Sequence, residues 1–471
     1  MRNDGAPGKL FVSFEIKALI ATLLTLTLVV AIWNIQPYNA NLLTSANTTI
    51  KSKSTTSPAT KLSNSRPTDP NKRIFTSYGN AASLFVQMGA YRGGTSSFAI
   101  IALSSKPIQV YGKPWYNCEW VSNNSSKPSM RAKATKMLPD WGYGRVYTTV
   151  VVNCTFPVNP NEDNSGGKLN IYAYYGKSTR KYEKIEALEE APGSYNESNY
   201  KPPYKYEYFY CGSSLYGELS ASRIREWMAY HAWFFGPSSH FVFHDAGGVS
   251  PDVRAVLEPW VRLGRVTIQD VRNQAEFDSY YYNQFAVVND CLHRYRNAAN
   301  WTFYFDVDEY IFMPDGRSLE SVLAEFSNVT QFTIEQYPMS SKFCLNDSTQ
   351  SYTSEWGFEK LVFRDSRMRI WRDRKYAIQA KNAFSTGIHL SENVTGITLH
   401  DTEGKIGYYH YHGSINVPGE PCRVFMPVST KTTGFFSEEK PFVYDDYMRN
   451  LSNTIKQFEE KTIGAIDVIN L

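Results

Sequence analysis

The chain has 471 residues, enough for two or three domains, and its formal net charge at pH 7 is only +4. The basic residues do not form one long run, so composition does not favour nucleic acid as a partner. Aromatic residues make up 15% of the chain, including 33 Tyr and 10 Trp. Such an excess suits a surface on which rings stack against sugars, although composition alone favours the simpler interpretation of a packed core.

A membrane anchor is the first predicted element, over residues 16–36. Residues 18–33 carry no charge, and with their apolar flanks they approach the ~20 residues that cross a bilayer. Basic residues precede this run, which predicts a cytoplasmic tail over residues 1–15. A cleaved signal peptide is the alternative, but no small-x-small cleavage site follows. The sequence therefore predicts a single-pass type II protein with its remaining residues in the secretory lumen.

Residues beyond the anchor agree with a lumenal location. N-x-S/T sequons recur along them, as in glycoproteins. The chain has 6 Cys and no C-x-x-C pair, which predicts scattered disulfides in an oxidising compartment and argues against zinc. Residues 37–73 are rich in Asn, Thr, Ser and Lys and cannot bury a core, so they are predicted to form a flexible stem.

Short strands broken by Gly, Pro and Asn follow from residue 74 to about 175. They predict a small all-β sandwich. Cys118 and Cys154 are the only cysteines in this region, and their pairing is the simplest expectation. A polar stretch over 176–203 is interpreted as a linker, so the β-domain with its linker is assigned to residues 74–200.

Alternating strand and helix patterns begin after residue 204. A strand over 206–211 is followed by a helix over 220–235 and a second strand over 240–245. The repeated βα unit predicts a mostly parallel, nucleotide-binding type of sheet. We therefore assign residues 201–471 to an α/β catalytic domain, whose part beyond residue 311 is strand-rich and irregular.

Asp306 and Asp308 follow an aromatic run over 300–305 that predicts a buried strand. Alternation would place both carboxylates on one side of the extended backbone and Glu309 on the other. Two carboxylates at the carboxyl end of a core strand suit a hard divalent cation, and ligands of open α/β sheets bind at this edge. The pattern predicts a metal that holds the diphosphate of a sugar nucleotide. A pair that only caps a turn is the plain alternative.

His410 and His412 occur two residues apart in an aromatic run, which places them on one face of a predicted strand. One of them could complete the metal site through a neutral imidazole, although two such histidines also occur by coincidence. The sequence leaves open which histidine is the ligand.

Two turns at the ends of the first two catalytic-domain strands are predicted to contact the nucleotide. Gly212 and Ser213 form the first of them. His244 and Asp245 form the second, where Asp245 could accept a hydrogen bond from uracil or ribose. Neither turn matches the dinucleotide fingerprint or the P-loop, so an ATPase or a dehydrogenase finds no support.

An inverting sugar transfer needs a general base near the acceptor hydroxyl. Glu355 and Glu359 are the candidates, and a plain surface carboxylate explains them equally well. Six basic residues between Arg364 and Lys375 are interpreted as a solvated face, with a phosphate or an acidic polysaccharide as the alternative ligand.

Several of these segments, taken as a set, resemble glycosyltransferase family 92. The resemblance covers about residues 204–450 and lies in the segments 225–231, 240–245, 306–310, 356–360 and 410–412. It implies an inverting enzyme of GT-A fold in the Golgi. Such an enzyme would use Mn²⁺ to move galactose from UDP-α-galactose onto the β-1,4-galactan side chains of pectic rhamnogalacturonan I.

The resemblance also assigns roles to residues. Asp306 and Asp308 would be the metal-binding acid pair, and one histidine of 410–412 would be the C-terminal metal ligand. Lys360 stands where many GT-A enzymes carry an acidic residue, which leaves the base in doubt and Glu359 only a candidate. Residues 74–200 would form a carbohydrate-binding module that holds the galactan.

The predicted fold class is thus an α/β, GT-A-type catalytic domain preceded by a small all-β sandwich and an N-terminal transmembrane helix. The expected partners are UDP-galactose, a β-1,4-galactan acceptor and the Golgi membrane. The oligomeric state is open, with a homodimer as one expectation. The alternatives are a GT-A enzyme with another UDP-sugar donor and a non-catalytic, lectin-like membrane protein. A two-metal phosphoryl-transfer enzyme or nuclease needs clustered carboxylates that the sequence does not offer.

Overall fold

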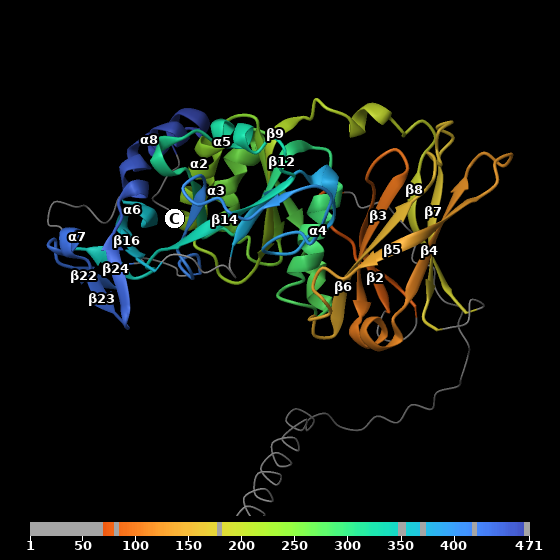
Figure 1. Cartoon of the computed structure of the whole chain (residues 1–471), viewed down its shortest axis with the longest axis horizontal. Helices are drawn as coiled ribbons and strands as arrows, with labels where there is room; N and C mark the ends of the chain where they lie inside the picture. The colour runs from red at the N-terminus through yellow and green to blue at the C-terminus, as the bar shows by residue number, and fades with distance from the viewer. Residues whose placement is uncertain are drawn as a thin grey trace, which may run out of the picture. The chain divides into compact units, whose positions relative to one another are not determined.

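The computed structural model describes residues 69–79, 84–176, 181–346, 355–367, 374–416 and 422–465, apart from the side chain of Asp315. All of them belong to the compact unit that begins at residue 66 (Figure 1). The predicted tail and anchor and residues 37–68 of the predicted stem lie outside the described residues. Within the described ranges, no helix is long and apolar enough to cross a membrane.

An eight-stranded antiparallel sheet forms the first part of this unit. Its strands are β1 (Thr76–Tyr78), β2 (Phe85–Arg92), β3 (Ser97–Ser105), β4 (Trp115–Ser122), β5 (Met130–Met137), β6 (Tyr147–Thr155), β7 (Gly167–Tyr174) and β8 (Glu183–Glu190), in the order β1-β2-β3-β6-β5-β4-β7-β8. Apolar residues of β2, β3 and β6 share one core with those of β4, β7 and β8, so the sheet folds over on itself. The predicted disulfide Cys118–Cys154 is confirmed and joins β4 to β6.

The stretch 176–203 was predicted to be a linker, and this was wrong for residues 183–190. They form β8, which pairs with β7 at the end of the sheet. Ile185 and Ala187 are buried, while charged side chains alternate with them and face outward. An edge strand needs only one apolar face. Its polar composition therefore concealed the strand.

A nine-stranded mixed sheet organises the second part of the unit. Its strands are β9 (Tyr206–Leu215), β10 (Ser239–Asp245), β11 (Val266–Asp270), β12 (Ala299–Tyr304), β13 (Glu309–Phe312), β14 (Gln331–Pro338), β17 (Lys375–Ile378), β20 (Thr398–Leu399) and β21 (Gly407–His410). The order is β11-β10-β9-β12-β17-β14-β21-β13, with β20 beside β14. The predicted parallel pairing holds from β11 to β12. Beyond β12 the pairing is mixed, because β17 runs antiparallel to both of its neighbours.

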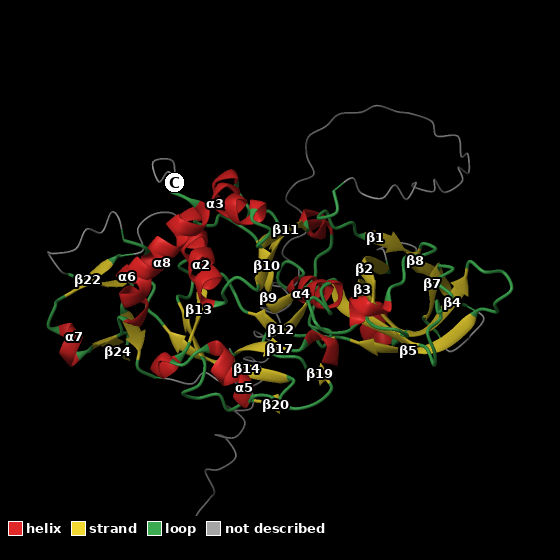
Figure 2. Cartoon of the chain, turned by 90° about the horizontal axis from the view of Figure 1, so that it is seen from above, coloured by secondary structure: helices red, strands yellow, loops and turns green. Residues whose placement is uncertain are grey.

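Helices cover both faces of this sheet (Figure 2). The helices of the described ranges are α2 (Ala221–Phe234), α3 (Pro251–Arg262), α4 (Gln284–Arg294), α5 (Leu319–Glu325), α6 (Gly357–Lys360), α7 (Thr430–Thr433), which lies beside β24 (Lys440–Tyr444) away from this sheet, and α8 (Tyr447–Ile463). Helices α2 and α3 begin at the side-chain caps Ser220 and Ser250 and pack on the face that carries Tyr208 and Tyr210. Helix α4 packs on the opposite face, where the disulfide Cys211–Cys291 links it to β9.

Helix α4 also contacts β2, β3 and β6 of the first sheet, so it lies between the two sheets. Val86, Ile101 and Leu103 from the first sheet share a buried cluster with Ala286 and Val287 of α4. The two parts therefore pack against each other through a common core.

Smaller elements complete the chain. They are β15 (Phe343–Leu345), β16 (Phe363–Asp365), β18 (Ala383–Ser385), β19 (Asn393–Val394), β22 (Val424–Met426), β23 (Phe435–Ser437) and β24 (Lys440–Tyr444), with the short helical turns η1 (Ile108–Gly112), η2 (Glu197–Tyr200), η3 (Arg272–Glu276), η4 (Pro314–Gly316) and η6 (Ala380–Asn382). A third disulfide, Cys344–Cys422, connects β15 to the segment that leads into β22.

Candidate active site

Asp306 and Asp308 lie in the turn that joins β12 to β13, and not on an extended strand as we had predicted. The backbone N–H of Glu309 donates to the Asp306 carbonyl at 3.2 Å and closes the turn. The Glu309 carboxylate accepts from the backbone N–H of Asp306 at 2.6 Å. Because strand alternation does not apply in a turn, Glu309 points back into the acidic cluster. The expectation that it would point away was wrong.

Aromatic side chains of β9 and α2 hold this turn in place. The indole N–H of Trp227 donates to the Glu309 carbonyl at 2.8 Å and lies 3.2 Å from the Asp306 carbonyl. The Tyr210 hydroxyl donates to the Phe305 carbonyl at 3.0 Å, just before the turn. These bonds satisfy buried backbone carbonyls that no strand partner reaches. They fix where the two aspartates can lie.

Asp306 is paired with a buried lysine. The Lys375 ammonium, on β17, lies 2.5 Å from one carboxylate oxygen, and the Ser213 hydroxyl donates to the other. Burial opposes ionisation of Asp306, but the charge of Lys375 and these hydrogen bonds outweigh it and lower its pKa to about 2. Burial raises the pKa of the neighbouring Glu309 carboxyl; Lys375 opposes this rise, while the Asp306 carboxylate adds to it.

A β-bulge brings Ser213 to Asp306. The register between β9 and β10 shifts between Val242 and His244, opposite Gly212 and Ser213. A Cβ atom at Gly212 would lie only 2.7 Å from the Tyr210 hydroxyl, so glycine is required there. Bulges re-aim side chains at the ends of strands. Here the bulge directs a hydroxyl to the acidic turn.

Three potential metal ligands come together beside this turn. Donor atoms of Asp308, His410 and His412 all lie within 4.8 Å of one another. A carboxylate with two imidazoles is a set of ligands that can bind a divalent transition-metal cation. Asp306, the fourth predicted ligand, is not part of this group and is instead paired with Lys375. The structure therefore brings together three of the four candidate ligands, including both histidines, of which the sequence predicted that one would bind the metal.

His410 is held on several sides. Its Nε2 lies 3.7 Å from Asp308 Oδ1, and the Gln336 amide contacts its Nδ1. Burial alone would lower the pKa of this imidazole, but the neighbouring carboxylates of Asp308 and Glu309 raise it. The Gln336 amide lies at Nδ1, which leaves Nε2 to face Asp308. A polar neighbour on one ring nitrogen fixes the orientation of a histidine that binds metal through the other.

A cavity of about 1010 Å³ opens at the acidic turn. Asp306, Asp308 and both histidines line it, together with Lys342 and other residues. Tyr216, which also lines it, stacks on Tyr282 with ring centres 3.8 Å apart. Cavities of this size accept a whole small-molecule ligand. The combination of acids, imidazoles, lysines and stacked rings suits a nucleotide sugar.

Comparison with known proteins gives the family. The model of glycosyltransferase family 92 matches residues 206–458, which include the acidic turn, both histidines and the segments that carried the resemblance. The chain belongs to glycosyltransferase family 92.

Relatives from Arabidopsis thaliana match over most of their length. Galactan beta-1,4-galactosyltransferase GALS1 is 61% identical over 100% of both chains. Galactan beta-1,4-galactosyltransferase GALS2 is 52% identical over 83% of this chain and 76% of the relative. Galactan beta-1,4-galactosyltransferase GALS3 is 48% identical over 90% of this chain and 84% of the relative. Among solved structures, a WbbM bifunctional glycosyltransferase matches 33% of this chain and 27% of its own, at 9% identity and a TM-score of 0.19, which is too low to bear on the fold.

In this family 92 domain, two of the five predicted nucleotide contacts, Ser213 and Asp306, line the cavity, and the other three are not among its lining residues. The Gly212 carbonyl contacts His244 Nδ1 at 2.8 Å. Asp245 accepts from the backbone N–H groups of Gly247 and Val249 and stabilises the turn after β10. The other three have structural contacts that sequence position alone does not reveal.

Glu355 and Glu359, the predicted candidates for the base, are likewise not among the residues that line the cavity. Glu359 contacts the Trp356 backbone N–H and pairs with Lys456 of α8 at 2.7 Å. Glu355 pairs with Arg449 of the same helix at 2.8 Å. Both carboxylates therefore have a structural role: Glu359 links α6 to α8, and Glu355 links the segment just before α6 to α8. The base is therefore better sought among the cavity-lining carboxylates.

Gly357 in the same family 92 segment has a steric explanation. A Cβ atom there would fall 1.3 Å from the Arg223 guanidinium, which forms a buried ion pair with Glu226. Arg223 also donates to the Ser414 hydroxyl at 3.2 Å. The glycine thus makes room for a charged pair that links α2 to the segment after the two histidines.

Lys375 is the residue that sequence analysis missed most clearly. We had interpreted the basic residues from Arg364 to Lys375 as a solvated face, and this was wrong for Lys375 and Arg374, which are buried. Arg369 and Arg372 lie outside the described residues. A run of like charges gives no signal of which member turns inward. Only the pairing of β17 with β12, which ends at the acidic turn, places Lys375 there.

Proposed function

We propose that this protein is an inverting galactosyltransferase that moves galactose from UDP-galactose to the non-reducing end of β-1,4-galactan. The observation that carries this proposal is the 61% identity, over the full length of both chains, with a galactan beta-1,4-galactosyltransferase. The cavity of about 1010 Å³ agrees with it, because a nucleotide sugar and an acceptor end must fit together.

Asp308, His410 and His412 would hold a divalent cation, which we propose to be Mn²⁺. When bound, such a cation supplies positive charge to the diphosphate that leaves with uridine. Asp306 stays ionised beside Lys375 and presents an acceptor for hydroxyl groups of the donor. Lys375 offsets the charge of this acidic turn, which favours binding of an anionic donor.

The general base in this proposal is Asp365, at the end of β16. Outside the acidic turn, Asp365 and Glu438 are the described carboxylates that line the cavity. Glu438 is 71% exposed and pairs with Lys342 at 2.6 Å, whereas Asp365 is only 14% exposed and pairs with Arg367 at the longer distance of 3.4 Å. Asp365 would take the proton from O4 of the terminal galactose as that oxygen attacks C1 of the donor. The C1–O bond to UDP breaks on the opposite face, so the configuration inverts.

The two sheets and the N-terminal segment have separate roles in this proposal. The first sheet would be a carbohydrate-binding module for galactan, as the family resemblance implies, and the second would be a GT-A-type catalytic domain. Residues 16–36 would anchor the enzyme in the Golgi membrane with its catalytic domain in the lumen, and a homodimer belongs to the same proposal.

Two other functions find less support. A two-metal phosphoryl-transfer enzyme needs a second cluster of ligands, and the described ranges contain one such group, that of Asp308. A lectin-like protein without activity would have no use for a buried lysine and an acidic turn in a large cavity. A different UDP-sugar donor remains the closest rival.

A donor panel separates these functions. The full-length enzyme in detergent is incubated with UDP-galactose, UDP-glucose, UDP-xylose or UDP-arabinose and with labelled galacto-oligosaccharides, with and without Mn²⁺. We expect extension with UDP-galactose and Mn²⁺ and little with the others. Extension with another sugar, or glycan binding without any transfer, would overturn the proposal.

A further inference from the structure

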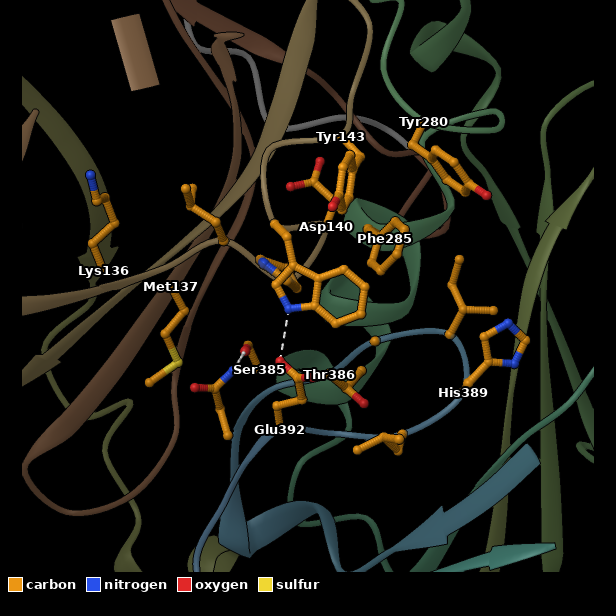
Figure 3. A pocket seen from close by; sticks show the side chains of 17 residues that line it. Lys136, Met137, Asp140, Tyr143, Tyr280, Phe285, Ser385, Thr386, His389 and Glu392 are labelled. Carbon is orange, nitrogen blue, oxygen red and sulfur yellow. Dashed lines mark hydrogen bonds between the residues drawn. The ribbon is translucent and has the colours of Figure 1, made fainter. Parts of the chain in front are cut away.

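A second cavity, of about 480 Å³, lies between the first sheet and the catalytic domain (Figure 3). One wall is the connection from β5 to β6, residues 138–146, and another is the connection from β18 to β19. Phe285 of α4 and Tyr280, just before that helix, also line it. No role described above uses this cavity.

Trp141 is presented in this cavity by a strained and well-supported turn. Its backbone φ is 49°, in the left-handed region that non-glycine residues rarely adopt. The preceding residue, Asp140, is fully buried and accepts from the Thr148 hydroxyl at 2.6 Å and from the backbone N–H groups of Gly142 and Thr149. Strain of this kind persists where the surroundings hold it, often at ligand sites.

Trp141 is nevertheless 62% exposed. Its indole N–H donates at 2.8 Å to the carboxylate of Glu392, a residue of the opposite wall of the cavity. This bond fixes the orientation of the ring and leaves much of its surface uncovered. A large aromatic ring held in place but not buried indicates a binding surface.

Further aromatic and polar side chains line the same space. Tyr143 is 70% exposed, and its ring lies 6.2 Å from that of Trp141 at a right angle. Tyr280 and Phe285 lie in edge contact with each other, and Thr386 is among the polar residues (Figure 3). Flat C–H faces of sugars pack on such rings, while their hydroxyls bond to carboxylate and hydroxyl groups. The lining therefore suits an oligosaccharide.

The second cavity adjoins the catalytic cavity, because Tyr280, Ile388 and His389 line both of them. A chain whose end lies beside Asp308 would pass over these three residues to reach Trp141. A ligand with many identical units in a row, such as a linear glycan, fits two adjacent cavities, whereas a single small molecule would need only one.

We propose that the cavity around Trp141 binds the acceptor galactan behind its growing end. It would hold sugar units several positions from the one that receives galactose. This inference rests on the proposed function, and it predicts that the enzyme favours acceptors long enough to reach from the catalytic cavity to Trp141.

Kinetics on a ladder of galacto-oligosaccharides, from the disaccharide upward, test this proposal with the full-length enzyme. Trp141→Ala should raise KM for long acceptors roughly tenfold, the scale of losing one well-placed aromatic contact. KM for UDP-galactose and for the disaccharide should not change. Tyr143→Ala should act in the same direction with a smaller effect.

Two variants separate ring stacking from backbone effects. Trp141→Phe keeps an aromatic ring and has the same left-handed backbone as Trp141→Ala, so it should recover most of the affinity for long acceptors. Tyr111→Ala is the matched control, because Tyr111 is 85% exposed in η1, between β3 and β4, and is not among the residues that line either cavity. It should behave as the unsubstituted enzyme.

Equal effects of Trp141→Ala on short and long acceptors, or no effect on either, would overturn the proposal. Calorimetric titration with long galacto-oligosaccharides distinguishes this failure from failure of the proposed function. Binding that weakens in Trp141→Ala while the unsubstituted protein transfers nothing would support the site and refute the activity. Transfer that is unchanged in this variant at every acceptor length would support the activity and refute the site.

Discussion

At the scale of single residues, Asp308 is central to the proposed metal site. Its carboxylate accepts from the Gly413 backbone N–H at 3.2 Å and lies beside both histidines. Asp306, two residues earlier, is occupied by Lys375. In the proposed function, the two aspartates of one short motif therefore have different roles, Asp308 toward a cation and Asp306 toward the donor.

Asp308→Asn should abolish transfer, with a loss of roughly 100-fold or more, because the variant removes a negative ligand from the metal group. The protein should also bind Mn²⁺ more weakly in a titration followed by calorimetry. Asp401→Asn, which changes an exposed carboxylate that is not among the cavity-lining residues, is the control. Full activity of Asp308→Asn would contradict the assigned role.

Asp365→Asn should lower kcat by roughly 100- to 10,000-fold with little change in KM, because a general base acts on the chemical step. Steady-state kinetics at saturating Mn²⁺ measure this. Glu438→Gln, on the same cavity wall, should keep most of the activity. If the two variants behaved in the opposite way, Glu438 would be the base.

At the scale of elements, α4 is the most informative helix, because it packs on both sheets. Asp290 on this helix is fully buried, and the Tyr91 hydroxyl of β2 donates to it. Burial raises the pKa of this carboxyl to about 6, although Arg73 and Tyr91 lower it. Its ordinary value is 3.8. Between these two values the folded protein holds a proton that the unfolded chain has released.

The free energy of unfolding contributed by Asp290 should therefore fall as pH rises from about 4 to about 6. Asp290→Asn cannot bind this proton and should lose that part of the slope. The difference between the two proteins should change by at most ~3 kcal/mol across this range, at about 1.4 kcal/mol for each pKa unit. Denaturant unfolding at a series of pH values measures it. Parallel pH profiles for both proteins would contradict the assigned pKa.

Elements also explain what the sequence could predict. The strand expected over 300–305 is β12 at 299–304, and the pairing of Cys118 with Cys154 followed from their being the only cysteines of the β-domain. These inferences needed only local pattern and simple elimination. The ion pairs of Glu355 and Glu359 with α8 join residues far apart in the chain, so no local pattern could reveal them.

The turn at Asp306 shows the same limit in another way. Period-two alternation placed Glu309 outside the cluster, and the tertiary bonds from Trp227 and Tyr210 overrode that pattern. Lys375 was hidden in a run of basic residues. The residues of the metal group were predicted from the sequence. Their geometry, and the pairing of Asp306 with Lys375, depend on contacts between distant parts of the chain and could not be predicted.

At the scale of the whole molecule, the two sheets share a buried cluster that contains Leu103 of β3 and Val287 of α4. We expect this shared core to make the described part unfold as one cooperative unit. Leu103→Ala should cost about 2–5 kcal/mol and lower a single thermal transition. Ile100→Ala, which faces the core of the first sheet alone, is the matched comparison. Scanning calorimetry that resolved two transitions, of which only one moved, would contradict cooperative unfolding.

The central claim, inverting transfer of galactose to galactan, is tested most directly by the structure of the product. The full-length enzyme, UDP-galactose and a defined galacto-oligosaccharide are incubated with Mn²⁺, and the new linkage is determined by NMR. We expect one added galactose in β configuration on O4 of the terminal unit. An α-linked product, a linkage to another hydroxyl, or an acceptor left unchanged would contradict it.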